Sequence, residues 1–454
     1  MINKAKVLLY NYFTKGHERT ILAKKNILAS FAIKVVTILC TFLSYPMTVD
    51  YLNPTRSGIW LTLSSVISWI VFFDIGIGNG LKNKFAEAKA KGNWIRAKKL
   101  VSSTYAIFGV IVLLISLIFT VLNTQLDWAW VLNVTPEYAT ELKELVWITF
   151  VSFCMLFLLR LITSIVTADQ KVALASFIDM LSQVFCLAAV FFLLKMDGEG
   201  SLIKFAWFMG LIPVVVYLLA SIILFRTRYK NVRPSFQSIE LPLCKEMFNL
   251  GSKFFVAGIS ALIMFQTTNV LISKITSPQE VVVYTTALKI FILGYNLLGI
   301  IILPYWSAFS DAYALKDFSW MRQTMKKLLL IFIVFVFCQL FILFISDWIY
   351  SFWMKDLIKI PYSMSVSVCI YSCMLAWILI CFNPLNGIGK MQLQLYSSIF
   401  EIVLMIPLAI FMGLQFGAIG IVLSPVLICL PRMIWGPIQL RKILNQTAQG
   451  IWNK

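Results

Sequence analysis

The sequence predicts an all-α integral membrane protein with twelve transmembrane helices in two six-helix lobes, related by a pseudo-two-fold axis along the membrane normal. Three observations support this fold class. The composition is 60% hydrophobic and only 13% charged, whereas a soluble domain is about one quarter charged. The apolar residues come in blocks of roughly 20, the length of a helix that crosses a bilayer. The alternating pattern of a membrane β-barrel is absent, which leaves helices as the spanning elements.

The predicted spans divide into two sets of six around 226–249, the longest polar stretch between them. The N-terminal lobe is expected at 26–225 and the C-terminal lobe at 250–440. A basic, amphipathic segment (1–25) precedes the first lobe, and a short tail (441–454) follows the second. The twelve spans are predicted at 27–48, 57–79, 101–122, 145–167, 172–194, 201–225, 250–272, 281–305, 328–346, 361–382, 391–413 and 416–438.

The two halves resemble each other at a fixed offset of 224 residues. Beyond the pairs that match at this offset, an insertion of two residues aligns Trp94 with Trp320. Two halves with an even number of spans each have the same orientation, so a duplication predicts an axis along the membrane normal and a cavity between the lobes. The matched pairs are Pro54/Pro278, Thr62/Thr286, Phe85/Phe309 and Ala88/Ala312.

The net charge of +19 is distributed according to the side of the membrane rather than as a patch for nucleic acid. With both termini in the cytoplasm, the inside segments hold 27 of the 39 Lys and Arg residues, and the outside loops hold six. This asymmetry is typical of a plasma-membrane protein. Segment 82–99 alone has seven cations, which anchor the inner end of the second span.

Several classes of chemistry are excluded by what the sequence lacks. No Walker phosphate loop is present, and the single histidine, His17, excludes His-based triads and zinc motifs of the HExxH type. The nine cysteines are odd in number and contain no CxxC, which argues against a disulfide framework and against a structural zinc site. A large loop that could carry a catalytic site is missing. We therefore expect neither an enzyme nor a resident metal or cofactor.

Nine ionisable residues fall within the predicted spans, and six of them are cations. A charge at the centre of the bilayer costs about 2.5–3.5 kcal/mol, so each must reach the headgroups, pair, or face a wet cavity. Lys204 and Lys253 lie near span ends and are expected to reach the headgroups. Cations in a cavity favour an anionic solute such as a phosphate or diphosphate. The candidate diphosphate-binding residues are Lys34, Arg160, Lys289 and Arg432, the last of which is equally well placed to reach the headgroups.

The three intramembrane acids are Asp74, Asp179 and Glu401. Each is a candidate either for a structural ion pair or for ion coupling or gating. Asp179 shares a helix face with Ser176 and Gln183, three residues before and four after it. Asp74 precedes three glycines that permit close approach or local unwinding of the helix. The sequence leaves both roles open for each acid.

Two stretches resemble the Wzx-type polysaccharide flippases of the multidrug/oligosaccharidyl-lipid/polysaccharide exporter superfamily. The first is Gly58-Ile-Trp60 followed by Phe73-Asp-Ile-Gly-Ile-Gly-Asn-Gly-Leu-Lys-Asn83, and the second is Leu385-Asn-Gly-Ile-Gly-Lys390. Asp74 lies within the first stretch, but the candidate cations lie outside both. The resemblance therefore gives no role to the cations, which are inferred from the residues alone.

The resemblance implies a flippase of alternating access that moves polyprenyl-diphosphate-linked oligosaccharide across the bacterial inner membrane, for a surface polysaccharide such as the O-antigen of lipopolysaccharide. Coupling to H⁺ or Na⁺ is typical of the superfamily, and a polysaccharide polymerase is an implied partner besides membrane lipids. The alternative is an ion-coupled drug or small-solute antiporter of the same superfamily, for which an acidic cavity is expected. A membrane glycosyltransferase, the third class, would need the catalytic loop that this chain lacks.

Overall fold

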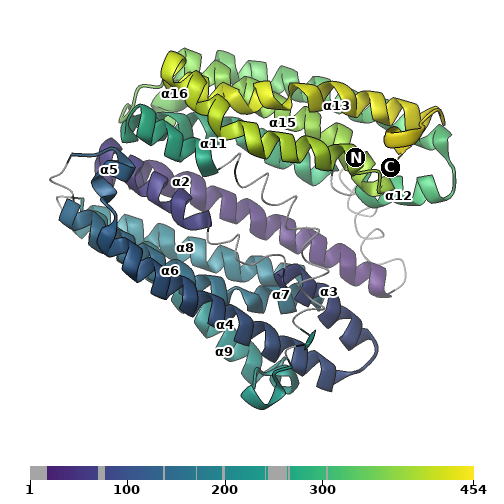
Figure 1. The fold of residues 1–454 in the computed structure, drawn as a ribbon, viewed down its shortest axis with the longest axis horizontal. Helices are drawn as coiled ribbons and strands as arrows, with labels where there is room; N and C mark the ends of the chain where they lie inside the picture. Colours follow the sequence, from purple (N-terminus) through teal and green to yellow (C-terminus); the bar gives the residue numbers. More distant parts are fainter. Residues whose placement is uncertain are drawn as a thin grey trace, which may run out of the picture. The chain divides into compact units, whose positions relative to one another are not determined.

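The structure is a computed structural model that describes residues 18–69, 77–135, 139–169, 171–196, 200–240, 242–243, 263, 266–302 and 305–453. Every regular element in these ranges is a helix (Figure 1). Most of the predicted span 250–272 lies outside the described residues, which include only 263 and 266–272 of it. Asp74, Lys253 and most of the predicted N-terminal segment also lie outside them.

Nine of the described helices are long and apolar enough to cross a membrane, which makes this an all-α, multi-pass membrane protein. They are α2 (Glu18–Ser68), α4 (Trp94–Gln125), α6 (Ala139–Leu159) continued by α7 (Leu161–Ala168), α8 (Val172–Met196), α9 (Leu202–Arg226), α11 (Pro278–Ile302), α13 (Phe318–Phe344), α15 (Tyr362–Ile388) and α16 (Gln392–Leu444). The shorter helices are α3 (Ile77–Ala90), α5 (Trp128–Leu132), α12 (Tyr305–Ala314), α14 (Ser346–Met354) and the 3₁₀ turns η3 (Lys230–Val232), η4 (Phe236–Ser238) and η5 (Gly450–Asn453).

Two of the long helices are interrupted by residues in the left-handed region. In α2 the interruption is Asn53 (φ 64°), which precedes a proline and so is driven out of the α conformation. In α16 it is Gly417 (φ 61°). The chain reverses there. Gly420 lies so close to Met412 that a Cβ atom at position 420 would be 2.1 Å from the Met412 carbonyl oxygen. Helix α16 is therefore a hairpin whose arms correspond to the last two predicted spans.

The chain separates into two compact units. Unit 1 comprises Met1–Asn53, Ile70–Trp128 and Glu137–Val256, and unit 2 comprises Pro54–Trp69, Ala129–Pro136 and Ala257–Lys454. The unit boundaries differ from those of the predicted lobes, because 54–69 and 129–136 belong to unit 2 and because unit 1 extends to Val256.

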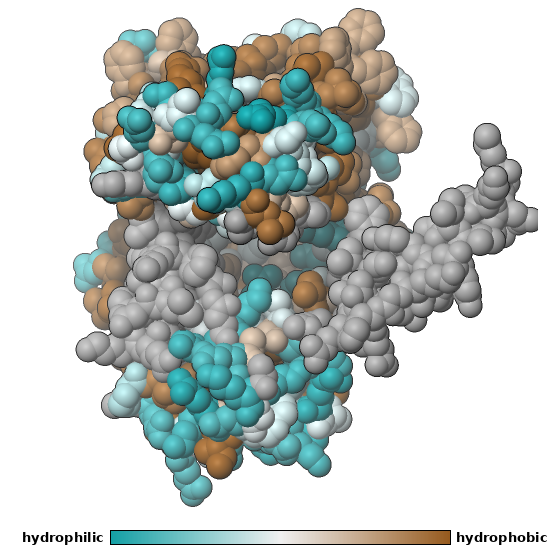
Figure 2. All heavy atoms as spheres, turned by 90° about the vertical axis from the view of Figure 1, so that its right-hand side faces the viewer, coloured by the Kyte–Doolittle hydropathy of each residue, from teal (hydrophilic) through white to brown (hydrophobic). Residues whose placement is uncertain are grey.

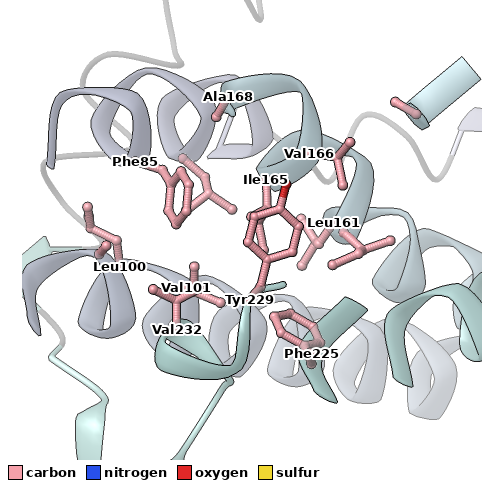
Figure 3. Packing of buried hydrophobic residues seen from close by; sticks show 14 of the residues in the cluster. Phe85, Leu100, Val101, Leu161, Ile165, Val166, Ala168, Phe225, Tyr229 and Val232 are labelled. Atoms are coloured by element: carbon pink, nitrogen blue, oxygen red, sulfur yellow. The ribbon is translucent and has the colours of Figure 1, made fainter. Parts of the chain in front are cut away.

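In unit 1, α9 packs against α6 and α8, while α3 packs against α4 and α7. The buried side chains that join α3, α4, α7 and the end of α9 include Phe85, Leu161 and Phe225 (Figure 3). Tyr229 and Val232, from the segment after α9, enter the same cluster. The start of the predicted 226–249 linker is thus part of the core of this unit.

Polar contacts hold the next part of the linker against α4. The backbone N–H of Ser235 donates to Oγ of Ser102 at 3.1 Å, and that of Glu240 donates to Oγ of Ser103 at 2.8 Å. The Glu240 carboxylate also pairs with Lys99. Backbone groups of the linker are therefore satisfied by side chains of α4, which fixes residues 229–240 in place.

Asp169, in the turn after α7, is buried among three partners. Lys89 of α3 and Arg228 form ion pairs with it, the latter at 3.1 Å from Nε to Oδ2. The Tyr229 hydroxyl donates to Oδ2 at 2.9 Å. Burial alone would raise the pKa of Asp169, but the hydrogen bonds from Lys89, Tyr229 and Arg228 outweigh burial and lower that pKa. This cluster joins α3, the α7–α8 turn and the linker.

In unit 2, α15 is the central helix and packs against α11, α12, α13 and α16. Buried polar groups there bond to one another. The Gln339 side-chain amide donates to the carbonyl of Phe291 at 3.0 Å and to Oγ of Ser372 at 3.2 Å. These bonds connect α13, α11 and α15 and give the N–H groups of the Gln339 side chain partners within the protein, as polar groups inside the membrane require.

The turns that precede α4 and α13 have the same local conformation. Gly92 and Lys316 lie 224 residues apart and have φ values of 68° and 58°. The next residues, Asn93 and Asp317, cap the helices by accepting a hydrogen bond from the backbone N–H three residues later, at 2.9 and 3.0 Å. The offset of 224 persists through the caps. The two-residue insertion that the sequence alignment places before Trp320 is therefore not present at that point.

The space-filling view in Figure 2 shows where polar side chains gather on the ends of the helices. Hydrophilic residues gather on the coloured parts of the face turned to the viewer, with hydrophobic residues among them and along the flanks. Exposed apolar side chains are numerous on the long helices, for example Leu117 on α4 and Ile223 on α9. A surface of this kind is expected of helices in contact with lipid.

Candidate intramembrane charged site

In unit 1, Arg160, Asp179 and Tyr217 form one polar cluster. They come from the junction of α6 and α7, from α8 and from α9. The Arg160 guanidinium lies 3.8 Å from Oδ1 of Asp179, which also accepts a hydrogen bond from the Tyr217 hydroxyl. The guanidinium carbon lies 5.6 Å from the centre of the Tyr217 ring. The arginine side chain is 57% exposed and the aspartate 48%, so both remain accessible.

A cavity of about 180 Å³ opens beside Arg160, with room for several water molecules. One wall is aromatic and includes Phe108 and Phe157, which stack with ring centres 4.9 Å apart. Thr163 and Ser164 add hydroxyl groups. The cavity therefore presents one cation and two neutral hydrogen-bonding groups on an apolar frame, an arrangement suited to an anion.

In unit 2, Glu401 and Arg432 pair across the α16 hairpin. Nε of Arg432 lies 3.0 Å from Oε1 of Glu401, and one terminal nitrogen donates to Oγ of Ser398 at 2.7 Å. The guanidinium carbon lies 5.5 Å from the centre of the Phe382 ring. The glutamate side chain is 1% exposed and the arginine 10%. This pair is enclosed by protein, and the tight turn at Gly417 brings it together.

Of the other predicted site residues, Asp74 lies outside the described residues. Lys34 is exposed on α2 and Lys289 is half-buried on α11. Lys204 is exposed in the first turn of α9, where the predicted contact with headgroups remains a prediction. The structure thus brings Arg160 to Asp179 and Arg432 to Glu401. The role of each residue in binding or coupling remains a prediction.

Three polar residues of these clusters were not predicted from the sequence. Tyr217 lies in the mostly apolar middle of α9. A hydroxyl group inside a predicted span was the signal that could have identified it. Ser398 stands three residues before Glu401, as Ser176 stands three before Asp179. Asp169 lies in a short turn on the side of the membrane where Lys and Arg are predicted to concentrate. A single acid among those cations could also have identified it.

Within unit 2, the segment 54–69 makes close contact with 267–290. A Cβ atom at Gly58 would lie 1.8 Å from the carbonyl oxygen of Pro278. The Gln279 amide donates to the Thr55 hydroxyl at 2.7 Å, and the Asn269 amide donates to the Ser65 hydroxyl at 2.9 Å. Only glycine at position 58 permits this approach, so the Gly58 of the family-like stretch has a packing role.

Among the residues that the structure describes, no group of three or more His, Cys, Asp or Glu side chains could hold a metal ion. The polar clusters above consist of cations, single carboxylates and hydroxyl groups. Their chemistry is that of ion pairing and hydrogen bonding.

Solved structures similar to this chain show its fold. A multidrug resistance MATE family transporter of the MOP superfamily in its inward-facing conformation matches with a TM-score of 0.76 and 15% identity, over 93% of this chain and 100% of its own. An outward-facing MATE transporter of the same superfamily matches with a TM-score of 0.63 and 16% identity, over 93% of this chain and 96% of its own. The fold is therefore MATE-like.

Curated relatives extend over most of the chain. A protein of Yersinia pseudotuberculosis, provisionally named as an O-antigen export protein, is 20% identical over 92% of this chain and 95% of its own length. A protein of Salmonella typhi, provisionally named as an O-antigen transporter, is 22% identical over 71% of this chain and 73% of its own. The profile of the family described as polysaccharide biosynthesis protein matches residues 23–310. With more than half of its length matched, the chain belongs to this polysaccharide biosynthesis family.

Proposed function

We propose that this protein is a flippase that carries polyprenyl-diphosphate-linked oligosaccharide repeat units across the bacterial inner membrane for surface polysaccharide synthesis. The observation that carries the proposal is the family match over 23–310, together with relatives named for O-antigen export. The Yersinia relative covers more than nine tenths of both chains, so the whole transporter is compared rather than one segment.

The proposal includes twelve spans in two six-helix lobes, with both termini in the cytoplasm. The matched turns and caps at Gly92/Asn93 and Lys316/Asp317 support a duplication at an offset of 224 residues. The seventh span is assigned to 250–272 from the sequence. The cytoplasmic side is assigned from the concentration of Lys and Arg in the segments on that side.

In this proposal Lys34, Arg160 and Lys289 bind the diphosphate. Arg160 has the strongest support, because a guanidinium has five N–H donors and this one pairs with a single carboxylate at 3.8 Å. It also lines a cavity, so unused donors can reach a phosphate oxygen. Arg432 is instead committed to Glu401 and Ser398, and its contribution is to hold the α16 hairpin.

Transport by alternating access requires contacts that open and close. The packing of 54–69 on 267–290, through Thr55 and Gln279, is our candidate for such a contact. Cysteines at positions 55 and 279, joined by an oxidised cross-link, are expected to stop transport reversibly, whereas either single variant keeps it.

Coupling to H⁺ or Na⁺ is the part of the proposal with the least structural support. Of the described acids, Asp179 has the accessible carboxylate that proton or Na⁺ exchange needs, whereas Glu401 is enclosed with Arg432. Asp74 stays a candidate from the sequence. Reconstituted transport measured with and without an imposed H⁺ or Na⁺ gradient tests coupling directly.

The second candidate function is an ion-coupled antiporter of drugs or small solutes. It is favoured by the multidrug transporters among the structural matches, but at 15–16% identity these show the fold alone. The surplus of cations over acids within the spans opposes a cavity for cationic drugs. Flipping of a defined lipid diphosphate in proteoliposomes, compared with uptake of a cationic dye, separates the two functions.

The cellular test uses a strain that lacks its own repeat-unit flippase and regains surface polysaccharide when this chain is expressed. Arg160→Glu, Lys34→Glu and Lys289→Glu are each expected to abolish the recovered polysaccharide, because a carboxylate repels the diphosphate. Lys327→Glu, an exposed position on the basic side, is the matched control. Full recovery by all three charge-reversed variants, at equal amounts in the membrane, contradicts the assignment of these cations.

A further inference from the structure

Unit 1 has a second cavity, of about 310 Å³, where α9 ends and the linker begins. It is separate in sequence from the cluster around Arg160. Its polar lining consists of Arg226, Arg233, Ser221 and Tyr105, and its apolar lining includes Phe225 and Pro234. Arg226 is the last residue of the spanning helix α9, so the cavity lies at the boundary of the membrane.

The two arginines come from different segments that the fold holds together. Arg226 belongs to α9, and Arg233 belongs to the linker, which is fixed by Val232 in the core and by the bond from Ser235 to Ser102. Both arginines are exposed. Among the ion pairs of the described residues, neither has a carboxylate partner. Two such guanidinium groups beside one cavity repel each other unless an anion lies between them.

The third polar group is the hydroxyl of Tyr105 on α4. It is buried and has no hydrogen-bond partner among the described residues. Its ring packs edge-on against Phe225, which also lines the cavity, with ring centres 5.9 Å apart. A buried hydroxyl without a partner is uncommon, and a ligand oxygen in the cavity would satisfy it.

The surroundings of the cavity indicate where such an anion comes from. Phe236 follows Arg233 by three residues and is 94% exposed, an unusual state for a phenylalanine in a segment so firmly attached to the protein. On α9, the exposed Leu219 and Ile223 continue the apolar surface toward the middle of the span. Aromatic side chains and arginines occur together where a protein meets lipid headgroups and the first carbons of the acyl chains.

We propose that this cavity binds the phosphate group of an anionic phospholipid, with Arg226, Arg233 and the Tyr105 hydroxyl on the phosphate oxygens and Phe236 among the acyl chains. The lipid is a resident of the same membrane rather than the transported molecule. The site rests only on insertion of α9 in a bilayer, so it stands or fails separately from the proposed flippase function. It gives the linker a role as an anchor on the membrane surface.

Native mass spectrometry of the full chain in detergent tests the site, with phosphatidylglycerol as the probe and phosphatidylcholine as the zwitterionic lipid of comparison. The variant is Arg226→Ala/Arg233→Ala. The matched control, Lys326→Ala/Lys327→Ala, removes two exposed cations from the same predicted side in unit 2. Thermal unfolding without lipid confirms that both variants fold.

We expect wild type to retain phosphatidylglycerol in preference to phosphatidylcholine, and the arginine variant to bind it about tenfold more weakly or worse, since each cation near a membrane surface contributes appreciably to the attraction of anionic lipid. The control keeps wild-type affinity, and Phe236→Ser weakens binding to a smaller extent. Equal affinity of wild type and arginine variant overturns the site. Displacement of the lipid by inorganic phosphate at comparable concentration assigns the arginines to a free anion instead and overturns the lipid proposal.

Discussion

The two intramembrane ion pairs contain the same chemistry in different surroundings. In both pairs an arginine meets a carboxylate. Each carboxylate lies on the next-to-last spanning segment of its half of the chain, and a serine stands three residues before each acid. Arg160 and Asp179 are 3.8 Å apart and about half exposed, whereas Arg432 and Glu401 are 3.0 Å apart and enclosed by Ser398 and Phe382. Arg160 of the unit 1 pair lines a cavity, whereas the unit 2 pair joins the two arms of a hairpin.

This difference shows that burial, rather than residue type, separates a structural charge from an available one. A buried charge that loses its partner remains without compensation in a medium of low dielectric constant. An accessible charge exchanges its partner for water or for a ligand at little cost. We therefore expect the two arginines to fail in opposite ways when they are replaced, the first in transport and the second in folding.

The largest effect is expected for Arg432→Leu. It leaves the Glu401 carboxylate buried and unpaired, at a cost of about 3–5 kcal/mol in the free energy of unfolding. Thermal unfolding of the purified protein and its amount in the membrane measure this loss. The double variant Glu401→Leu/Arg432→Leu removes both charges and is expected to recover much of the stability. A single variant as stable as wild type contradicts the structural role of the pair.

The second prediction concerns Gly436, one turn after Arg432. A Cβ atom there would lie 2.7 Å from the Phe382 ring, which also packs beside the Arg432 guanidinium. Gly436→Ala should displace the ring and cost about 1–3 kcal/mol of stability. Gly109→Ala on α4 is the control, because a Cβ at that position has no atom within 4 Å. Equal melting temperatures for the two variants would show that the enclosure of Arg432 is loosely packed.

Asp169 supplies a third case, a buried acid outside the spans whose cationic partners are partly exposed. Asp169→Asn loses charge-assisted hydrogen bonds from Lys89 and Arg228, at about 1–3 kcal/mol at neutral pH. Because the folded-state pKa of Asp169 is lowered, its contribution is complete near neutrality and is lost as the pH falls below about 4. Unfolding measured against pH should show the gap between wild type and variant closing in acid. A gap that stays constant with pH contradicts the role of the charge.

The smallest change in stability is expected for Arg160→Ala, below about 1 kcal/mol, because both side chains of the pair are about half exposed. Polysaccharide export should nevertheless be lost, and Arg160→Lys should restore part of it by returning a charge without the full set of donors. Export assays at matched amounts of protein, combined with thermal unfolding, separate these outcomes. Strong destabilisation by Arg160→Ala would make the two pairs alike and remove the contrast.

The sequence predicted the helical membrane fold because length and hydropathy of a span are local properties. It placed the break of α2 between two predicted spans, because Asn53 lies between 27–48 and 57–79. The break of α16 at Gly417 instead falls just inside the predicted span 416–438. It did not predict which charge was buried. Arg160 and Arg432 look alike in their sequence contexts, and only the packing of Tyr217 or of Ser398 and Phe382 around them decides their exposure.

The hydrogen bond between Gln279 and Thr55 joins two positions that are 224 residues apart, the offset of the proposed duplication. Under that duplication the two residues descend from a single position in an ancestral chain of half the length. A residue can touch its own counterpart only beside the symmetry axis of a homodimer, where both partners must be identical. If the proposed duplication took place, fusion of the two halves in one chain lifted this constraint and let one copy become a threonine hydroxyl and the other a glutamine amide that donates to it.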